Sequence, residues 1–327
     1  MQKKKEIKGK EVISHLADIY QQLYVKPDEN GKKIYSEIVQ KGNDAPVRDL
    51  SHFIRSDKDS LLYEKTPAGE VCVITLFERK DFITFLQIMG NKCTPVDIPD
   101  TQGASILDGV INWTRIYDHK KEFLAAEKKK GSLFPNWNDE FNRFTKKKSN
   151  YLDAIIVLSV GPYSNISAEK TGFSEDELIK ISYDIRRFHE CTHFLCRRNY
   201  PDKIDAVWDE LVADAVGIYG ALGKYDMNLE KLFLGIKGDL YEGGRLENYV
   251  KEEDENKKAT ELTRLAKRCS DILKIFDSEI SKAGEKGPFD IAVMLEEMKE
   301  KIEESLAQIE DKFKSKIDAK ADNFQIT

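Results

Sequence analysis

The chain has 327 residues, a formal net charge of −6, and 34% charged residues. This length can bury a large core in one large or two modest domains. The acidic balance argues against nucleic acid as a partner, because the lysine runs at 3–5, 128–130 and 146–148 are short and have acidic neighbours. No stretch approaches a membrane span and the N-terminus lacks an apolar h-region, so we expect a cytoplasmic protein without a membrane partner.

The first 150 residues predict an N-terminal α/β region. Helical spacing of apolar residues predicts helices over about 12–23, 33–40, 81–89, 105–128 and 136–145. The segment 81–89 would also fit a strand, but Phe82, Leu86 and Met89 share a helical face. The β-branched run 71–77 predicts a strand.

A metal-site core is predicted over residues 151–250. Its first element is the apolar run 152–160, which reads as a strand and ends before Gly161-Pro162. At the edge of a sheet, this strand could pair with an extended peptide. Ser174 and Glu177 then form a capping-box signature for a helix from Glu175 to about Arg198.

This helix contains His189-Glu190-Cys191-Thr192-His193, an H-E-x-x-H pattern. Residues four apart project about 40° apart around a helix, so both imidazoles can face one ion. Two neutral nitrogen ligands leave zinc Lewis-acidic, and Glu190 can take the proton of a zinc-bound water. Cys191 lies about 200° around the helix from His189 and should face away. The pattern predicts a zinc-dependent hydrolase, most simply a peptidase.

A second helix is predicted over about 202–222. Glu210 and Asp214 lie one turn apart on it, within an otherwise apolar stretch. A Glu can complete a His, His, Glu zinc site, and a carboxylate one turn later can accept the N–H of a ligand imidazole. Asp209 lies about 100° around the helix from Glu210 and should matter little. Asp209 and Asp214 remain rival third ligands.

These two motifs resemble those of the gluzincin metallopeptidases over about residues 152–222. The resemblance implies that His189 and His193 are zinc ligands, Glu190 the general base, Glu210 the third ligand and Asp214 the residue that orients a ligand imidazole. The connection between His193 and Glu210 is shorter than is usual in that family. No further His follows His193, so a Tyr or Arg would have to stabilise the transition state.

The passage 238–245 falls where gluzincins place groups that contact the substrate. Tyr241, Arg245 and Tyr249 are therefore candidate catalytic donors to a tetrahedral oxyanion. A flexible connector is the competing interpretation of the same glycine-containing passage.

Residues 251–327 predict a C-terminal helical region. Long amphipathic helices over 261–280 and 289–317, separated by a turn, predict an antiparallel helical pair packed on the core. Such a pair could also serve for self-association. The three regions 1–150, 151–250 and 251–327 could equally form one compact domain.

The expected fold class is α+β, predominantly helical, with a zincin-like active-site helix beside a small sheet. The expected function is zinc-dependent hydrolysis of amide bonds in a peptide or protein substrate. Two alternatives stay open: a structural zinc site closed by a fourth ligand such as Asp209 or Cys196, and a non-catalytic interaction protein that uses its C-terminal helices. The five cysteines include no C-x-x-C pair and suit free thiols.

Overall fold

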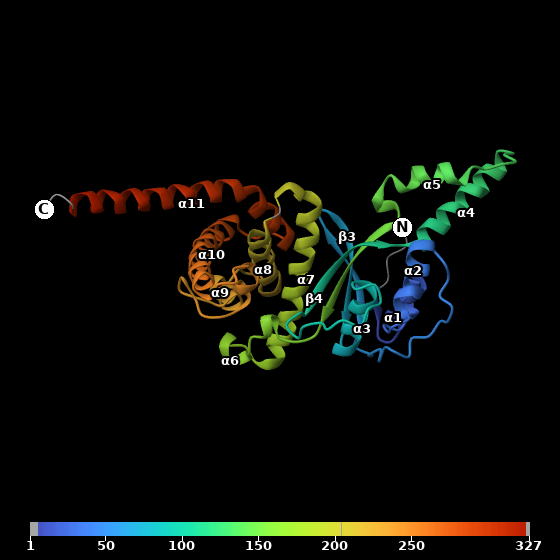
Figure 1. Ribbon diagram of the computed structural model, residues 1–327, viewed down its shortest axis with the longest axis horizontal. Helices are drawn as coiled ribbons and strands as arrows, with labels where there is room; N and C mark the ends of the chain where they lie inside the picture. Colours follow the sequence, from blue (N-terminus) through green and yellow to red (C-terminus); the bar gives the residue numbers. More distant parts are fainter. Residues whose placement is uncertain (1–5, 204, 325–327) are drawn as a thin grey trace. The chain divides into compact units, whose positions relative to one another are not determined.

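The computed structural model describes residues 6–203 and 205–324, and the chain divides after Gly161 into two compact units. The division differs from the boundary expected at residue 150, because the strand 152–159 belongs to the first unit. Residues 251–327 belong to the second unit together with the predicted metal-site helices. The expected α+β class with a predominance of helix is confirmed (Figure 1).

The first unit is built on a mixed five-stranded sheet in the order β1-β2-β3-β5-β4. The strands are β1 (Ile7–Lys8), β2 (Ser60–Thr66), β3 (Gly69–Leu76), β4 (Ala104–Ile111) and β5 (Leu152–Ser159). β5 runs parallel to β3 on one side and antiparallel to β4 on the other. Both of its edges are therefore paired, and the prediction that it could recruit an extended peptide is wrong.

The helix predicted over 105–128 is divided between two elements. Residues 104–111 form β4, and α4 (Trp113–Lys129) begins only after Asn112, whose side chain accepts a hydrogen bond from the backbone N–H of Arg115. The register of β4 shifts between Asp108 and Val110, because Gly109 has a φ of 78° and bulges out of the ladder. This bulge hides the strand alternation in the sequence.

The other helices of the first unit lie close to the predicted segments. They are α1 (Glu11–Ile19), α2 (Gly31–Lys41), α3 (Arg79–Met89) and α5 (Trp137–Thr145). Residues from α1, α3, β3 and β5 share one apolar core, in which Ile13, Phe82 and Ile155 are fully buried. Burial of such side chains contributes about 1.5–3 kcal/mol each.

A polar cluster, which we call the Asp153 cluster, joins β5 to α1 and α4. The hydroxyl of Tyr20 donates to Asp153 Oδ2 at 2.6 Å, and the side-chain amide of Asn112 donates to the same oxygen at 2.7 Å. Arg115 pairs with Asp153 Oδ1. The carboxylate is thereby saturated by three donors from different elements, as a partly buried charge requires.

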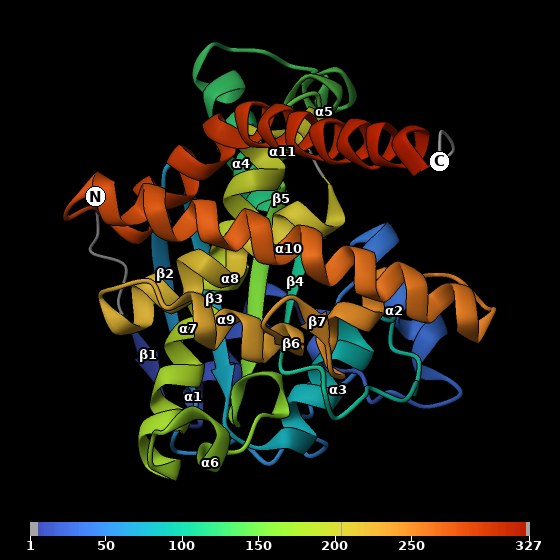
Figure 2. The ribbon, with the colours of Figure 1, turned by 90° about the vertical axis from the view of Figure 1, so that its left-hand side faces the viewer.

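The second unit is helical apart from a small hairpin. It contains α6 (Ala168–Thr171), α7 (Glu175–Asn199), α8 (Ala206–Leu222), α9 (Met227–Leu234), α10 (Glu255–Ala283), α11 (Pro288–Phe324) and the strands β6 (Ile236–Lys237) and β7 (Leu240–Tyr241). Figure 2 shows α10 lengthwise over α8, α9 and the hairpin, all of which it contacts. Within the described residues, none of the helices combines the length and apolar character needed to cross a bilayer.

The C-terminal helices run in opposite directions, as in the predicted antiparallel pair, but they cross instead of lying along each other (Figures 1 and 2). In Figure 1, α10 is viewed nearly along its axis whereas α11 runs across the picture, so the two helices cross. α11 packs more extensively on α8 than on α10. Its first turns bury Ile291 and Leu295, and this burial holds the helix against the core, while it also contacts α10.

The two helices that carry the predicted site, α7 and α8, contact each other extensively. Two glycines of α8 face α7 at this contact. A Cβ at Gly217 would lie 2.9 Å from the carbonyl oxygen of Ile185, and one at Gly220 would lie 2.3 Å from the ring of Phe188. No side chain fits in these places without displacing α7, so the glycines set a short distance between the helices.

Candidate metal centre

The helix α7 presents His189 and His193 on one buried face. Its N-terminus has the predicted capping box, in which Ser174 and Glu177 satisfy each other's backbone N–H groups. The two histidines are 6% and 4% exposed, and their Nε2 atoms are 3.0 Å apart. The one-turn spacing has thus brought two imidazole nitrogens to a single point.

Glu210 on α8 faces these nitrogens. Its Oε2 lies 3.7 Å from Nε2 of His189, and its Oε1 lies 3.4 Å from Nε2 of His193. One ligand atom from each of the three residues can be chosen so that all lie within 4.8 Å of one another. Zinc binds nitrogen at about 2.0–2.1 Å and carboxylate oxygen at about 2.0–2.2 Å. Donors separated by 3.0 to 3.7 Å can all reach one such ion.

Each imidazole has its own carboxylate on the opposite nitrogen. Nδ1 of His189 lies 2.8 Å from Oδ1 of Asp214, and Nδ1 of His193 lies 2.8 Å from Oδ2 of Asp209. Since a carboxylate only accepts, these contacts assign the proton of each neutral ring to Nδ1. Both Nε2 lone pairs then face each other, a repulsive arrangement that a shared cation relieves.

The charges around the two histidines also favour a cation. Asp209, Glu210 and Asp214 are three carboxylates, and Arg245 is the cation that pairs with one of them. With both imidazoles neutral, these groups leave two net negative charges. A buried excess of that size is costly without compensation, and a divalent ion supplies the required charge.

Tyr163 and Arg245 enclose Asp214, which is fully buried. The hydroxyl of Tyr163 donates to Asp214 Oδ1 at 2.6 Å and accepts from Arg245 Nη1 at 2.9 Å, and Arg245 also pairs with Asp214 Oδ2. Burial raises the pKa of Tyr163 well above its usual value, and Asp214 adds to the shift although Arg245 opposes it. The tyrosine therefore stays a donor, and the cluster fixes the carboxylate that holds His189.

The carboxylates control the titration of the cation-free centre. Burial lowers the pKa of His193, but hydrogen bonds and charge from Asp209 and Glu210 more than offset this and raise it to about 10. Burial raises the pKa of Glu210, and the nearby histidines reverse the effect and lower it. When no cation is bound, His193 is therefore protonated, and its positive charge balances part of the negative charge of the carboxylates.

The predicted catalytic donors have different surroundings. Tyr241 is bonded away from the centre, because its single hydroxyl proton is shared between the carbonyl of Gly244 at 2.9 Å and Glu247 at 3.2 Å. Arg245 lies at the centre, but its guanidinium is engaged by Asp214 and Tyr163. Tyr249 lies beside Glu210, and burial together with that carboxylate raises its pKa.

Glu190, the predicted base, is half-buried on α7 next to His189. Among the residues that the structure describes, its side chain has no hydrogen bond or ion pair. A carboxylate without a protein partner beside the ligands is free to take a proton from water.

Asp209, which was expected to matter little because it lies about 100° around the helix from Glu210, lies at the centre and contacts His193. Two histidines one turn apart can take orienting groups from two directions. α8 supplies Asp214 to one and Asp209 to the other. The sequence did offer a sign of Asp209, since it is an acidic residue directly before Glu210. No sequence pattern pointed to Tyr163, because its role depends on a contact with Asp214, 51 residues away.

The other potential ligands are held elsewhere. The thiol of Cys196 lies 3.7 Å from Glu296 of α11, and burial raises its pKa. Cys191 is fully buried and is not among the residues whose donor atoms converge. Within the described chain, the convergent set comprises only His189, His193 and Glu210.

Residues 3–310 match the family described as "Family of unknown function (DUF7005)". No curated protein and no solved structure matches the chain. The gluzincin resemblance therefore rests on the two sequence motifs alone.

Proposed function

The chain belongs to this family of unknown function, DUF7005, and we propose that it is a zinc-dependent hydrolase of amide bonds, a metallopeptidase, with His189, His193 and Glu210 as its zinc ligands. The observation that carries the proposal is the pair of Nε2 atoms 3.0 Å apart, each on a ring whose other nitrogen bonds a separate carboxylate. Carboxylate-oriented histidines of this kind are typical of metal sites.

Zinc, when bound, polarises a carbonyl group and lowers the pKa of a coordinated water toward neutrality. The protein supplies the other functions. Glu190 accepts a proton from the attacking water and returns it to the leaving amine. Asp214 and Asp209 keep the imidazoles in the tautomer that presents Nε2. Tyr249, whose hydroxyl interacts with Glu210, would be free to donate to the developing oxyanion once Glu210 holds the zinc, whereas the hydroxyl of Tyr241 is bonded to the turn at Gly244.

Metal analysis and one isosteric substitution test the proposal. Purified protein should contain about one zinc per chain, and His189→Ala or His193→Ala should lose it. Glu190→Gln should keep the zinc and the fold but reduce cleavage of a mixed peptide library by about 10²–10⁴-fold or more. Wild-type zinc content in both histidine variants would refute the metal site. Unchanged cleavage in Glu190→Gln would refute the assigned base.

A structural zinc site is the alternative that the geometry favours less. It needs a fourth protein ligand, for which Asp209 and Cys196 were the candidates. Asp209 bonds Nδ1 of His193, and Cys196 contacts Glu296. A three-ligand site leaves a position for water, as catalytic zinc sites do. A non-catalytic interaction protein would bind no zinc, and the same metal analysis distinguishes it.

A further inference from the structure

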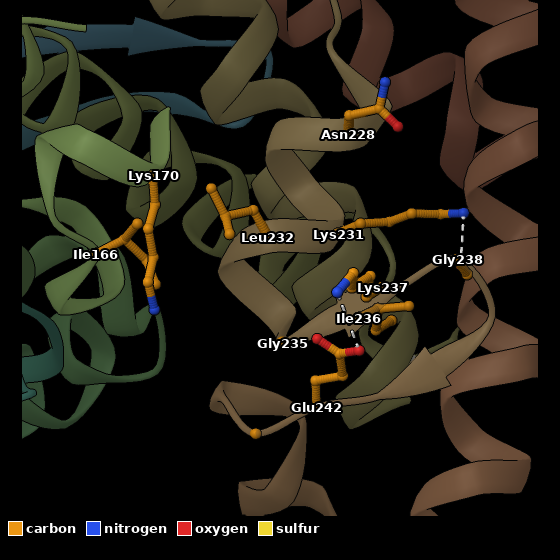
Figure 3. Close-up of a pocket in the computed structure, with 11 residues that line it drawn as sticks. Ile166, Lys170, Asn228, Lys231, Leu232, Gly235, Ile236, Lys237, Gly238 and Glu242 are labelled. Atoms are coloured by element: carbon orange, nitrogen blue, oxygen red, sulfur yellow. Dashed lines mark hydrogen bonds and ion pairs between the residues drawn. The ribbon is translucent and has the colours of Figure 1, made fainter. Parts of the chain in front are cut away.

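The second unit contains a pocket of about 410 Å³ outside the metal centre (Figure 3). One wall comes from Ile166 and Lys170, and the other from α9 and the β6–β7 hairpin. Lys170, Lys231 and Lys237 contribute three cations to its lining against one carboxylate, Glu242. This positive excess contrasts with the net charge of −6 of the whole chain.

Lys231 is the most informative residue of the pocket. It is 8% exposed, and its ammonium donates to the carbonyl oxygen of Gly238 at 3.0 Å. No carboxylate lies within 4.0 Å of it in the described part of the chain. Burial lowers its pKa and repulsion from Lys274 adds to the effect, although the charges of Asp239 and Asp271 oppose it without forming an ion pair. Lysines this buried are normally paired, so an anion is the missing partner.

The other two lysines stand at the mouth of the pocket. Lys237 lies 3.5 Å from Glu242, and both side chains are more than half exposed. Lys170 is exposed and has no ion pair among the described residues. Both can turn toward a ligand at small cost, because exposed ion pairs contribute at most about 1 kcal/mol.

The hairpin exposes bare main chain to the pocket. Gly235, Gly238 and Gly243 line it, and all three have positive φ values. A Cβ at Gly235 would lie 2.4 Å from the carbonyl oxygen of Gly243, whereas one at Gly238 or Gly243 would meet no atom within 4 Å. Backbone groups without covering side chains allow close approach of a ligand. Ile166, Leu232 and Ile236 add an apolar surface.

We propose that this pocket binds a small organic anion, a carboxylate or a phosphate monoester with a short apolar body, whose charge pairs with Lys231. The volume is in the range of small-molecule sites and exceeds what a bare inorganic anion fills. The apolar residues contact the body of the ligand. Lys170 lies across the pocket from the ammonium of Lys231 and Lys237 lies between them (Figure 3), so both add to the positive potential that attracts the anion. The inference does not depend on the proposed zinc chemistry.

Matched ligand pairs test the proposal by isothermal titration calorimetry. N-acetyl-L-leucine is compared with its neutral amide, and phenyl phosphate with phenol. One charged member should bind at least about 10-fold more tightly than its neutral partner, equivalent to about 1.4 kcal/mol. The pair that shows the difference identifies the anionic group. Equal binding within both pairs, or no binding of either anion, overturns the proposal.

Protein variants locate the binding. Lys170→Gln combined with Lys237→Gln should weaken binding about 10-fold, whereas Lys274→Gln, outside the pocket lining, should not. His193→Ala should leave anion binding unchanged. Loss of anion binding in this variant would show that the anion binds at the metal centre and would refute the proposed pocket site.

Lys231→Met provides a second measurement. The one hydroxyl proton of Ser270 is shared between Asp239 Oδ1 at 2.5 Å and the carbonyl of Gly238 at 3.1 Å. The variant should therefore lose anion binding, and its circular dichroism spectrum should show that the fold is unchanged. Retained binding in Lys231→Met contradicts the proposal.

Discussion

The two units contain the same polar assembly in two settings. In the Asp153 cluster, an aspartate is bonded by Tyr20 and Arg115, and in the metal centre Asp214 is bonded by Tyr163 and Arg245. The tyrosine contact is 2.6 Å in both. They differ in the remaining partner, which is an amide from Asn112 in the first and the imidazole of His189 in the second.

That one partner changes what the assembly can do. The asparagine amide ends the network, because its carbonyl oxygen already accepts a hydrogen bond from the backbone N–H of Arg115. An imidazole that donates from Nδ1 presents an Nε2 lone pair on its far side, and this one faces His193 and Glu210. The side chain of Asp153 is 27% exposed and that of Asp214 is 0% exposed. An Asp-Arg-Tyr cluster by itself is thus a structural brace, and convergence with other donors makes it part of a site.

The largest effect is expected for Asp214→Asn. Zinc affinity should fall by about 10–100-fold, because His189 loses its carboxylate, and stability should fall by about 3–5 kcal/mol, since Arg245 is left unpaired. The matched variant Asp153→Asn should cost about 1–3 kcal/mol and leave zinc affinity unchanged. Competition with a chromophoric chelator and urea unfolding measure the two quantities. Equal zinc loss in both variants would break the comparison.

A smaller loss, nearer to about 10-fold, is expected for Asp209→Asn. Asp209 contacts His193, has no arginine partner among the residues that the structure describes, and is 9% exposed. Glu190→Gln is the control, because it removes a neighbouring carboxylate that touches neither imidazole nitrogen. Zinc affinity equal to wild type in Asp209→Asn would restore the view that only one histidine is oriented by a carboxylate.

The metal-free protein should lose stability as the pH rises from about 6.5 to about 10. The pKa of His193 is raised to about 10 in the fold and is about 6.5 when unfolded. Its contribution is therefore fully present below pH 6.5 and is lost as the pH passes through the folded value. The loss should be on the order of a few kcal/mol. Unfolding of chelator-treated wild type and His193→Gln across this range should show the slope in the wild type alone.

The smallest effect is expected for Tyr241→Phe. The hydroxyl holds the turn at Gly244 rather than the centre, so zinc affinity and any peptide cleavage should stay within about twofold of wild type. Tyr249→Phe is the contrasting variant, and it should lower the cleavage rate by about 10²–10³-fold at unchanged zinc affinity. A larger loss of cleavage in Tyr241→Phe than in Tyr249→Phe would show that Tyr241, and not Tyr249, acts at the centre.

Local patterns predicted the elements that carry the ligands. The capping box and the H-E-x-x-H spacing fixed α7, and the E-x-x-x-D spacing fixed the face of α8, because each depends on residues within two turns. β4 escaped detection, since the bulge at Gly109 interrupts its alternation. The crossing of α10 and α11 was equally hidden, because amphipathic spacing shows that a helix packs but not at which angle.

The predicted site was incomplete where partners come from distant parts of the chain. His189, His193, Glu210 and Asp214 were expected together and lie together. Tyr163 and Arg245 both contact Asp214, from which they are separated by 51 and 31 residues in the sequence. Such contacts are set by tertiary packing, for which one sequence offers no periodic signal.

The glycine contact between α7 and α8 has a consequence for which ions the centre can accept. At Gly217 and Gly220 the two helices are in close contact. This contact sets the distance between the imidazole nitrogens of α7 and the Glu210 carboxylate of α8. A rigid gap of this kind discriminates by ionic radius: it suits ions of the size of zinc or cobalt and strains around calcium, whose oxygen ligands lie at about 2.3–2.6 Å. Gly217→Ala would push the helices apart and shift the preference toward larger ions such as cadmium. If the proposed centre binds a metal ion, its selectivity would thus reside partly in two residues that carry no side chain.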